Sequence, residues 1–283
     1  DATNVITPLV SVITSLYLDH TSILGDTLEQ IAFEKGGIIK PGIPVVSSPQ
    51  DERAIEVLRE IAQEKSTSLV EIDKEYPFQH LSRSLDGQEF KIHPLDEELA
   101  DEFSIPLLGD FQVINAVTAY AALDLLREGG FPIAEDAIKR GFAEVIWPAR
   151  FEVLRAHPPV IVDSAHNPDS MRKLRETIDD FFPELDLTLV FGISEDKQLD
   201  GMLKEILPRT TNLITTQADH PRAMDPEDLA RRADGYGCNI EVVPVVGDAL
   251  EKGLSLSGEK NLLVVAGSVF VAASARIAWF EGH

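Results

Sequence analysis

An aspartate and a histidine closely follow a short apolar run in the second half of the chain, at Asp163 and His166. The run Val160–Val162 has no polar alternation, which is typical of a strand buried on both faces of a parallel sheet. Asn167 and Pro168 then predict a helix start, because asparagine accepts a backbone N–H and proline suits the first helical position. Asp163 and His166 are therefore expected on a strand-to-helix turn.

This turn has two interpretations, which the turn alone does not separate. In open α/β sheets, ligands bind outside the carboxyl ends of the strands, and helix N-termini there favour anions. Under this interpretation the turn is part of a binding site. The alternative is that Asp163 only caps the turn and that His166 is an ordinary surface histidine.

The elements around this turn alternate between strands and helices, which predicts a Rossmann-like sheet in a second domain that begins near Trp147. The predicted elements are helix 168–182, strand 187–191, helix 197–207, strand 212–216, helix 226–232, strand 240–243, helix 248–254, and a strand, turn and helix over 262–280.

The first half of the chain predicts another parallel sheet, because it also alternates between strands and helices. Asp26 and Glu29 have the spacing of a capping box that opens a helix, and Gly36 and Gly37 are expected to end it. The other predicted elements are strand 8–18, strand 43–46, helix 52–65, strand 68–72, an antiparallel excursion at the edge of this sheet between 76 and 106, and helix 115–128.

Length and composition are those of a soluble globular protein with two modest domains: 283 residues, 44% hydrophobic and 26% charged. The formal net charge of −23 argues against nucleic acid and anionic membranes as partners. The single cysteine, Cys238, cannot form an internal disulfide, which fits the reducing cytoplasm. The longest uncharged stretch, 262–275, is too short to span a bilayer.

Two blocks in the middle of the chain, Trp147–Val153 and Asp163–Asp169, resemble the entry to the C-terminal domain of folylpolyglutamate and dihydrofolate synthases, members of the Mur-ligase superfamily. The resemblance implies an α/β fold with two domains. An incomplete P-loop-type parallel-sheet ATPase domain, residues 1–146, would precede a Rossmann-like Mur-ligase C-terminal domain, residues 147–283. Further blocks in the family order lie at 1–4, 18–20 with 24–28, 34–42, 108–112 with 115–116, and 191–192 with 196–197.

The resemblance implies a magnesium site at His20 and Lys35. The family histidine is a metal ligand, and the family lysine is carbamylated. Lys35 is therefore also expected to be a catalytic residue. An uncharged lysine amine adds carbon dioxide and becomes an anion, which requires a pKa below the usual value of about 10.4. The alternative is that Lys35 only complements the dipole at its helix end.

Asn115, Arg150 and Asp163 match family positions that bind the nucleotide. An amide can pair with the edge of adenine, a guanidinium can hold phosphate oxygens, and a carboxylate can accept ribose hydroxyl protons. Taken singly, Asn115 could be only the N-cap of its helix, and Arg150 only an interdomain salt-bridge partner.

Asp163, His166, Gly267 and Ser268 match positions associated with the incoming glutamate, and His166 is also expected to be catalytic. A glycine and a hydroxyl at a strand-to-helix turn offer backbone N–H groups to a carboxylate. The alternative for this pair is a turn glycine and a helix cap. Lys197 is a weaker candidate for binding phosphate or a substrate carboxylate.

The chain departs from the family pattern at Phe111, Ser164 and Gly36, where the family often has histidine, glycine and alanine. A larger departure is that no Gly-x-x-x-x-Gly-Lys-Ser/Thr motif occurs in the sequence. In the family, that P-loop precedes the block with which this sequence begins. We therefore expect the C-terminal portion of an enzyme, which by itself should be a poor ATPase.

The reaction implied by the resemblance is ATP-dependent ligation of L-glutamate to a folate or dihydropteroate carboxylate through an acyl phosphate. ATP and Mg²⁺ are the expected cofactors, the substrates are small molecules, and a missing N-terminal P-loop segment is a candidate partner. Two alternatives stay open. One is another Mur-type amino-acid ligase, and the other is a non-catalytic or split-enzyme module that binds glutamate or nucleotide.

Overall fold

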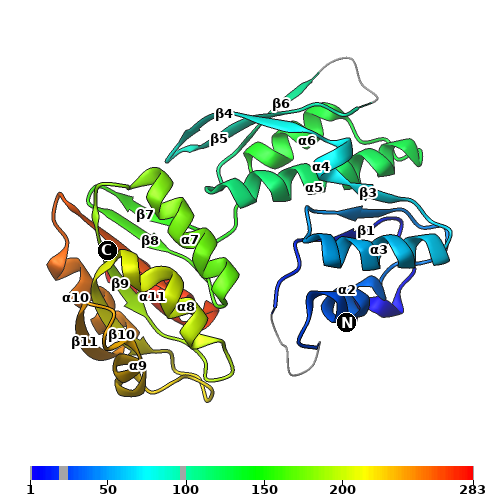
Figure 1. Cartoon of the computed structure of the whole chain (residues 1–283). Coiled ribbons are helices and arrows are strands. Elements are labelled where there is room, and N and C mark those ends of the chain that lie inside the picture. The colour runs from blue at the N-terminus through cyan, green and yellow to red at the C-terminus, as the bar shows by residue number, and fades with distance from the viewer. Residues whose placement is uncertain (1, 19–24, 96–99, 283) are drawn as a thin grey trace. The chain divides into compact units, whose positions relative to one another are not determined.

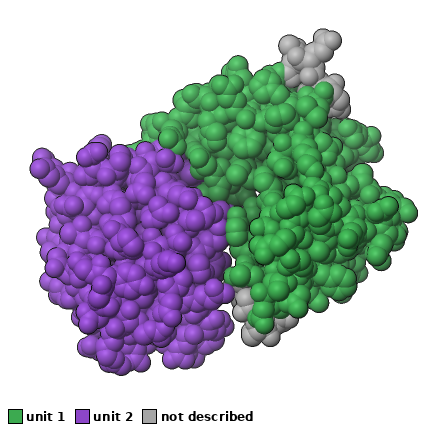
Figure 2. All heavy atoms as spheres, viewed as in Figure 1, with its two compact units in different colours: residues 1–106, 110–145 green, residues 107–109, 146–283 purple. Residues whose placement is uncertain are grey.

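The computed structural model describes residues 2–18, 25–95 and 100–282 (Figure 1). The chain divides into two compact units (Figure 2). Unit 1 contains residues 1–106 and 110–145, and unit 2 contains residues 107–109 and 146–283. None of the helices in the described ranges is long and apolar enough to cross a membrane.

Unit 1 is built on a three-stranded parallel sheet of order β1-β2-β3. Its apolar core lies between this sheet and the helices that follow β1 and β2, with Ile13, Ala32, Val45 and Leu58 among its buried side chains. The elements of this part are η1 Ala2–Val5, β1 Ser11–Ile13, α2 Leu28–Gly36, β2 Val45–Ser47, α3 Glu52–Glu64, β3 Leu69–Glu71 and α4 Ile72–Glu75.

Helix α2 ends at Gly36 as predicted, but it does not begin with the predicted capping box. Thr27 is the N-cap, and its hydroxyl accepts a hydrogen bond from the Gln30 amide at 3.3 Å. The Asp26 amide instead donates to the Gln30 side chain at 2.8 Å. The prediction of Asp26 as N-cap is therefore wrong, because the extended backbone of Thr27 places a hydroxyl where the cap is needed.

The antiparallel strands predicted between residues 76 and 106 are present, but they form a separate sheet of order β4-β5-β6 and do not extend the edge of the parallel sheet as predicted. Tyr76 and Tyr120 connect this region to the following helix, because their hydroxyls hydrogen-bond to Asp124 at 2.9 Å and Asp101 at 3.1 Å. The elements are β4 Phe78–Ser84, β5 Gly87–Ile92, β6 Asp101–Ile105, α5 Asp110–Glu128 and α6 Glu135–Ala143.

Two features of these helices differ from the prediction. Helix α5 begins at Asp110 and not at Asn115, so Asn115 lies inside the helix and is not its N-cap. Helix α6 was not predicted, although Ile138 is buried. It has only nine residues, and four of them are charged.

Unit 2 contains a six-stranded sheet of order β11-β10-β9-β12-β8-β7, parallel except for the β7–β8 pair. The last strand in the sequence, β12, lies between β9 and β8. The elements are β7 Glu152–Ala156, β8 Pro159–Val162, α7 Pro168–Phe181, β9 Asp186–Phe191, α8 Leu199–Ile206, η2 Leu207–Arg209, β10 Thr210–Gln217, α9 Pro226–Ala233, β11 Asn239–Val245, α10 Val246–Leu256, β12 Asn261–Ala266 and α11 Val269–Gly282.

Strand β8 is buried at all of its residues, as its apolar run predicts. One core of unit 2 packs alternate residues of the sheet, such as Val160 and Val162, against α10 and α11. Burying one aliphatic side chain of this size contributes about 1.5–3 kcal/mol to stability. The predicted α/β fold with parallel sheets is confirmed. Strand β7 is an addition that the sequence did not predict.

Candidate functional site

The carboxylate of Asp163 holds the turn that follows β8. Its Oδ1 accepts a hydrogen bond from the Ala165 amide, and its Oδ2 accepts one from the Phe151 amide, both at 2.7 Å. The residue is 7% exposed, so this carboxylate is nearly removed from water. Asp163 therefore connects the β8–α7 turn to the segment before β7. Each oxygen keeps lone-pair capacity for one further donor.

Burial raises the pKa of Asp163 above its ordinary value, because a carboxylate loses hydration inside the protein. The amides of Phe151 and Ala165 oppose this effect by hydrogen-bonding to the charged form, and the charges of Arg150 and His166 oppose it more weakly. The effect of burial is the larger one, so the net result is a raised pKa for Asp163.

The segment before β7 has a strained backbone. Ala149 has φ of 55° and Phe151 has φ of 46°, in the left-handed region that side chains rarely adopt. Each such residue costs about 1–2 kcal/mol, so the surroundings must hold it in place. The Ala149 amide donates to Glu152 Oε2 at 2.8 Å, and the Ala149 carbonyl accepts from the Ser164 amide at 3.0 Å.

Arg150 lies between these two strained residues and is half-buried. Its guanidinium donates a hydrogen bond to the Ser164 hydroxyl, on the same turn as Asp163. The position where the family often has glycine thus supplies a polar partner for Arg150 in this chain. The strained segment aims the arginine at the β8–α7 turn.

His166 is half-buried next to the first turn of α7. Its Nδ1 lies 3.0 Å from the Ser164 carbonyl oxygen, and its backbone amide donates to Ser170 Oγ at 3.0 Å. A proton on Nδ1 would donate to this carbonyl and leave Nε2 as the acceptor of the ring. The predicted helix start is confirmed, because Asn167 is the N-cap, with Pro168 in the first turn.

The turn between β12 and α11 packs against the same edge. The Gly267 amide donates to the Ala165 carbonyl at 3.0 Å. Gly267 has φ of 109°, and a Cβ there would lie 2.5 Å from both the Gly192 carbonyl oxygen and a ring carbon of Phe191. Only glycine fits this position without displacement. Ser268 is buried, and its hydroxyl accepts from the Phe270 amide at 3.2 Å, so it caps the start of α11.

The remaining candidates lie elsewhere. Lys35 is half-buried in the last turn of α2, and Asn115 is exposed on α5, where its amide donates to Gln112 Oε1 at 3.1 Å. Lys197 is half-buried in the loop between β9 and α8. His20 falls outside the described residues. Within the described ranges, no group of three or more His, Cys, Asp or Glu side chains could hold a metal ion.

The structure therefore brings together five of the predicted residues in unit 2. Arg150, Asp163, His166, Gly267 and Ser268 gather where β8 and β12 end, through hydrogen bonds that join the three segments. Lys35 and Asn115 belong to unit 1.

Sequence reasoning missed the roles of Glu152 and Arg276, which support this edge. Glu152 lies inside the Trp147–Val153 block, which resembles the family sequence. Arg276 has no local signal, because its partner is 124 residues away in the sequence.

Comparison with known protein families gives two matches along the chain. Residues 1–123 match the Mur ligase middle domain, and residues 149–269 match the family model described as Mur ligase, glutamate ligase domain. The two matches cover most of the chain, which belongs to the Mur ligase family.

Within the family, the chain is similar to enzymes named for folate glutamylation. It is 30% identical to the dihydrofolate synthase/folylpolyglutamate synthase of Bacillus subtilis, over 98% of this chain and 64% of the relative. The structure of Mycobacterium tuberculosis folylpolyglutamate synthase complexed with ADP superposes with a TM-score of 0.87 and 32% identity, over 100% of this chain and 65% of that one. The Escherichia coli enzyme in complex with DHPP and ADP superposes with a TM-score of 0.86 and 27% identity, over 99% of this chain and 64% of that one. The chain thus spans a little under two thirds of the length of these relatives.

Proposed function

We propose that this chain is part of an enzyme that joins L-glutamate to the carboxylate of a folate or dihydropteroate, using ATP. The observation that carries the proposal is the convergence of Arg150, Asp163, His166 and the Gly267–Ser268 turn at one sheet edge, in a chain of the Mur ligase family. The relatives named for this activity and the ADP-bound neighbour support it.

In the proposed reaction, a carboxylate oxygen of the substrate attacks the terminal phosphorus of ATP. An O–P bond forms, the bond from that phosphorus to ADP breaks, and the products are an acyl phosphate and ADP. The amine of L-glutamate then attacks the acyl carbon, so that a C–N bond forms, the C–O bond to phosphate breaks and inorganic phosphate leaves. The amine must lose a proton, and we assign its acceptance to Nε2 of His166, since Nδ1 faces the Ser164 carbonyl.

The other residues of the proposed site would bind the nucleotide and the incoming glutamate. Arg150 would hold phosphate oxygens, and Asp163 would accept a hydrogen bond from a ribose hydroxyl with the lone pairs that its two amide partners leave. The amides of the Gly267–Ser268 turn, at the start of α11, suit a carboxylate of the incoming glutamate. Asn115 would contact the adenine edge from α5.

Mg²⁺, when bound, would offset the charge that builds on the transferring phosphoryl group. His20 and Lys35 are the residues that would hold it. An ammonium group repels a cation, so Lys35 fits this role only after carbamylation, which replaces the positive charge with a carboxylate-like group.

We further propose that residues 1–146 form part of the ATPase domain and that residues 147–283 form the glutamate-binding domain of a cytoplasmic enzyme. The family models support this division, since one ends at residue 123 and the other begins at residue 149. Because the chain spans 64% of the Bacillus subtilis relative, the complete reaction is proposed for the intact protein.

The test is glutamate-dependent ADP release by the intact protein with folate or dihydropteroate as acceptor. We expect His166→Ala to lower the rate by about 10²–10⁴-fold, the usual contribution of a general base. Asp163→Ala should also lower it by orders of magnitude. His93→Ala is the matched control, because His93 is exposed and lies in unit 1.

Near-normal ADP release by the His166 variant would remove its catalytic role. Extension of a UDP-linked muropeptide, with no extension of either pteridine acceptor, would refute the folate assignment.

A further inference from the structure

We propose that Glu152 and Arg276 are positioning residues for Arg150, and that they act through the backbone of Ala149. This inference rests on the proposed function, because it assigns Arg150 to the nucleotide. Neither residue is among the candidate site residues identified from the sequence, and all three belong to unit 2.

The first step is the contact between Glu152 and the strained segment. Glu152 Oε2 accepts a hydrogen bond from the Ala149 amide at 2.8 Å. Ala149 has φ of 55°, and Phe151 has φ of 46° on the other side of Arg150. A backbone of this kind persists only where its surroundings hold it. Glu152 therefore holds the residue before Arg150, as Asp163 holds the residue after it.

The second step is the contact that fixes Glu152 itself. Arg276 Nε lies 2.9 Å from both carboxylate oxygens of Glu152. The two side chains are 37% and 22% exposed, so water screens this pair only in part. The Arg276 guanidinium also lies over the ring of Phe280, 4.9 Å from its centroid, on the same helix. Arg276 thus has a defined position from which to orient the carboxylate.

The third step connects the two sides of the proposed site. Arg276 lies on α11, the helix whose first turn follows Gly267 and Ser268. Arg150 reaches the Ser164 hydroxyl on the β8–α7 turn. The series α11, Arg276, Glu152, Ala149, Arg150 therefore joins the turn assigned to glutamate with the residue assigned to phosphate. Loss of either charge should loosen Arg150 and leave the α11 turn in place.

The test uses the intact protein with Glu152→Ala, Glu152→Gln and Arg276→Lys. Loss of one hydrogen bond of ordinary strength corresponds to about a threefold to tenfold change in affinity. We expect Glu152→Ala to raise the KM for ATP and the dissociation constant of MgADP by at least this factor. Glu152→Gln should raise them less, because glutamine keeps an oxygen for the Ala149 amide. Arg276→Lys should also raise them less, because lysine keeps the charge.

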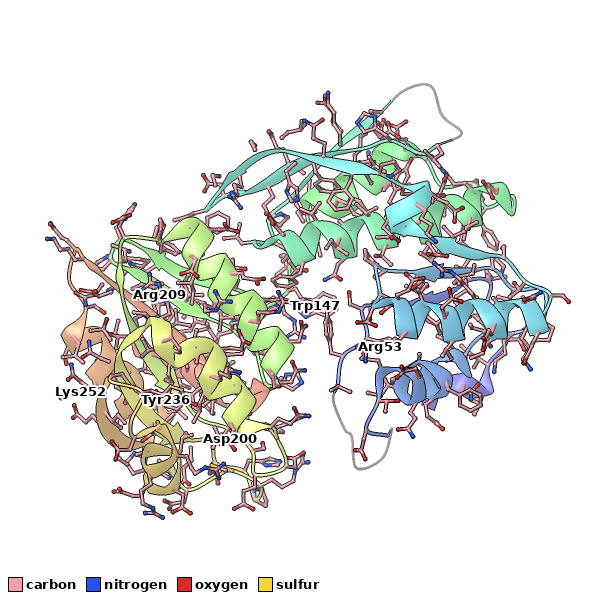
Figure 3. All side chains as sticks on the ribbon, viewed as in Figure 1. Arg53, Trp147, Asp200, Arg209, Tyr236 and Lys252 are labelled. Carbon is pink, nitrogen blue, oxygen red and sulfur yellow. The ribbon has the colours of Figure 1, made fainter. Side chains whose placement is uncertain are left out.

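Two further readouts separate positioning from a general loss of stability. The KM for glutamate should stay within about twofold, because the Gly267–Ser268 turn does not depend on this pair. Hydrogen exchange of a peptide spanning residues 147–153 should accelerate in Glu152→Ala. Glu241→Gln is the matched control, since Glu241 lies on β11, at the opposite edge of the sheet from β7, and pairs at 2.8 Å with Lys252 of α10. Figure 3 labels Lys252.

The outcomes distinguish this inference from the proposed function. If the unaltered protein binds MgADP and the Glu152 and Arg276 variants bind it equally well, the positioning role is refuted alone. If these variants weaken ATP and glutamate together, in step with a lower melting temperature, the pair is only structural and the inference also fails. If the unaltered protein binds no nucleotide, the proposed function fails and this inference fails with it.

Discussion

Replacing Gly267 with alanine should destabilise unit 2 more than the same replacement at Gly235, which has a similar φ but no atoms nearby. Gly267 has φ of 109°, and a Cβ there would lie 2.5 Å from the Gly192 carbonyl oxygen and 2.5 Å from a Phe191 ring carbon. Gly235 is the matched control, because its φ is 94° and a Cβ there would have nothing within 4 Å. The two substitutions share the backbone strain, and only Gly267→Ala adds a collision with backbone.

The magnitudes follow from these two terms. A left-handed backbone costs a residue with a side chain about 1–2 kcal/mol, which is the expected effect of Gly235→Ala. Overpacking a rigid site costs about 1–3 kcal/mol more, so Gly267→Ala should lose about 2–5 kcal/mol. The collision should also displace the Ala165 carbonyl, which accepts from the Gly267 amide at 3.0 Å. The β8–α7 turn would move with it.

Equilibrium unfolding in urea, followed by tryptophan fluorescence, measures both variants in unit 2. The chain has two tryptophans, Trp147 and Trp279, and both belong to this unit (Figure 3 labels Trp147). Trp279 is 8% exposed and packs in the core beside α10, so its emission should change on unfolding. Equal free energies of unfolding for the two variants would refute the argument from the collision.

Three further predictions concern the same edge. Ala149→Gly should stabilise the protein by about 0.5–1 kcal/mol, because relief of about 1–2 kcal/mol of strain exceeds the extra chain entropy; a lower melting temperature would contradict this. Asn167→Ala should cost about 1 kcal/mol in thermal unfolding, since the Ser170 amide loses its cap at 2.8 Å; an unchanged melting temperature would argue that water replaces the cap. Burial raises the folded pKa of Asp163, so the native state holds this proton more tightly and the contribution of Asp163 falls as pH rises from about 4. The stability difference between the unaltered protein and Asp163→Asn should therefore shrink with rising pH, and a difference that grows would reverse the assigned direction.

The parts of unit 2 that were predicted correctly depend on local signals. The run Val160–Val162 has no polar residue, and Asn167 with Pro168 marks a helix start in adjacent positions. Strand β7 lacks such a signal. Its first four residues, 152–155, are all half-buried, so neither a continuous apolar run nor an alternation of apolar and polar residues marks it. Its pairing with β8 decides the strand, and a single sequence does not reveal pairing.

The candidate site was predictable only in its outline. The strand-to-helix turn placed Asp163 and His166 correctly on one turn, and the structure adds why Asp163 is held there. Nothing in the sequence indicates that Ala149 and Phe151 are left-handed, since neither is glycine. The predicted N-cap at Asp26 was wrong because Thr27 caps α2 instead, and the predicted helix start at Asn115 was wrong because α5 already begins at Asp110.

The position of β12 has a consequence for how this protein is made. The strand runs between β9 and β8, with Val264 beside both Leu189 and Ile161, and it is synthesised after the other five strands of this sheet. Until it is synthesised, the β7–β8 hairpin and the strands β9 to β11 have no shared neighbour. Until then, the unpaired backbone groups and apolar side chains of β8 and β9 are exposed on that side. Exposed strand edges of this kind favour aggregation and chaperone binding. A premature stop codon just before Asn261 would therefore remove a central strand of the sheet and leave β8 and β9 each without a neighbour on that side.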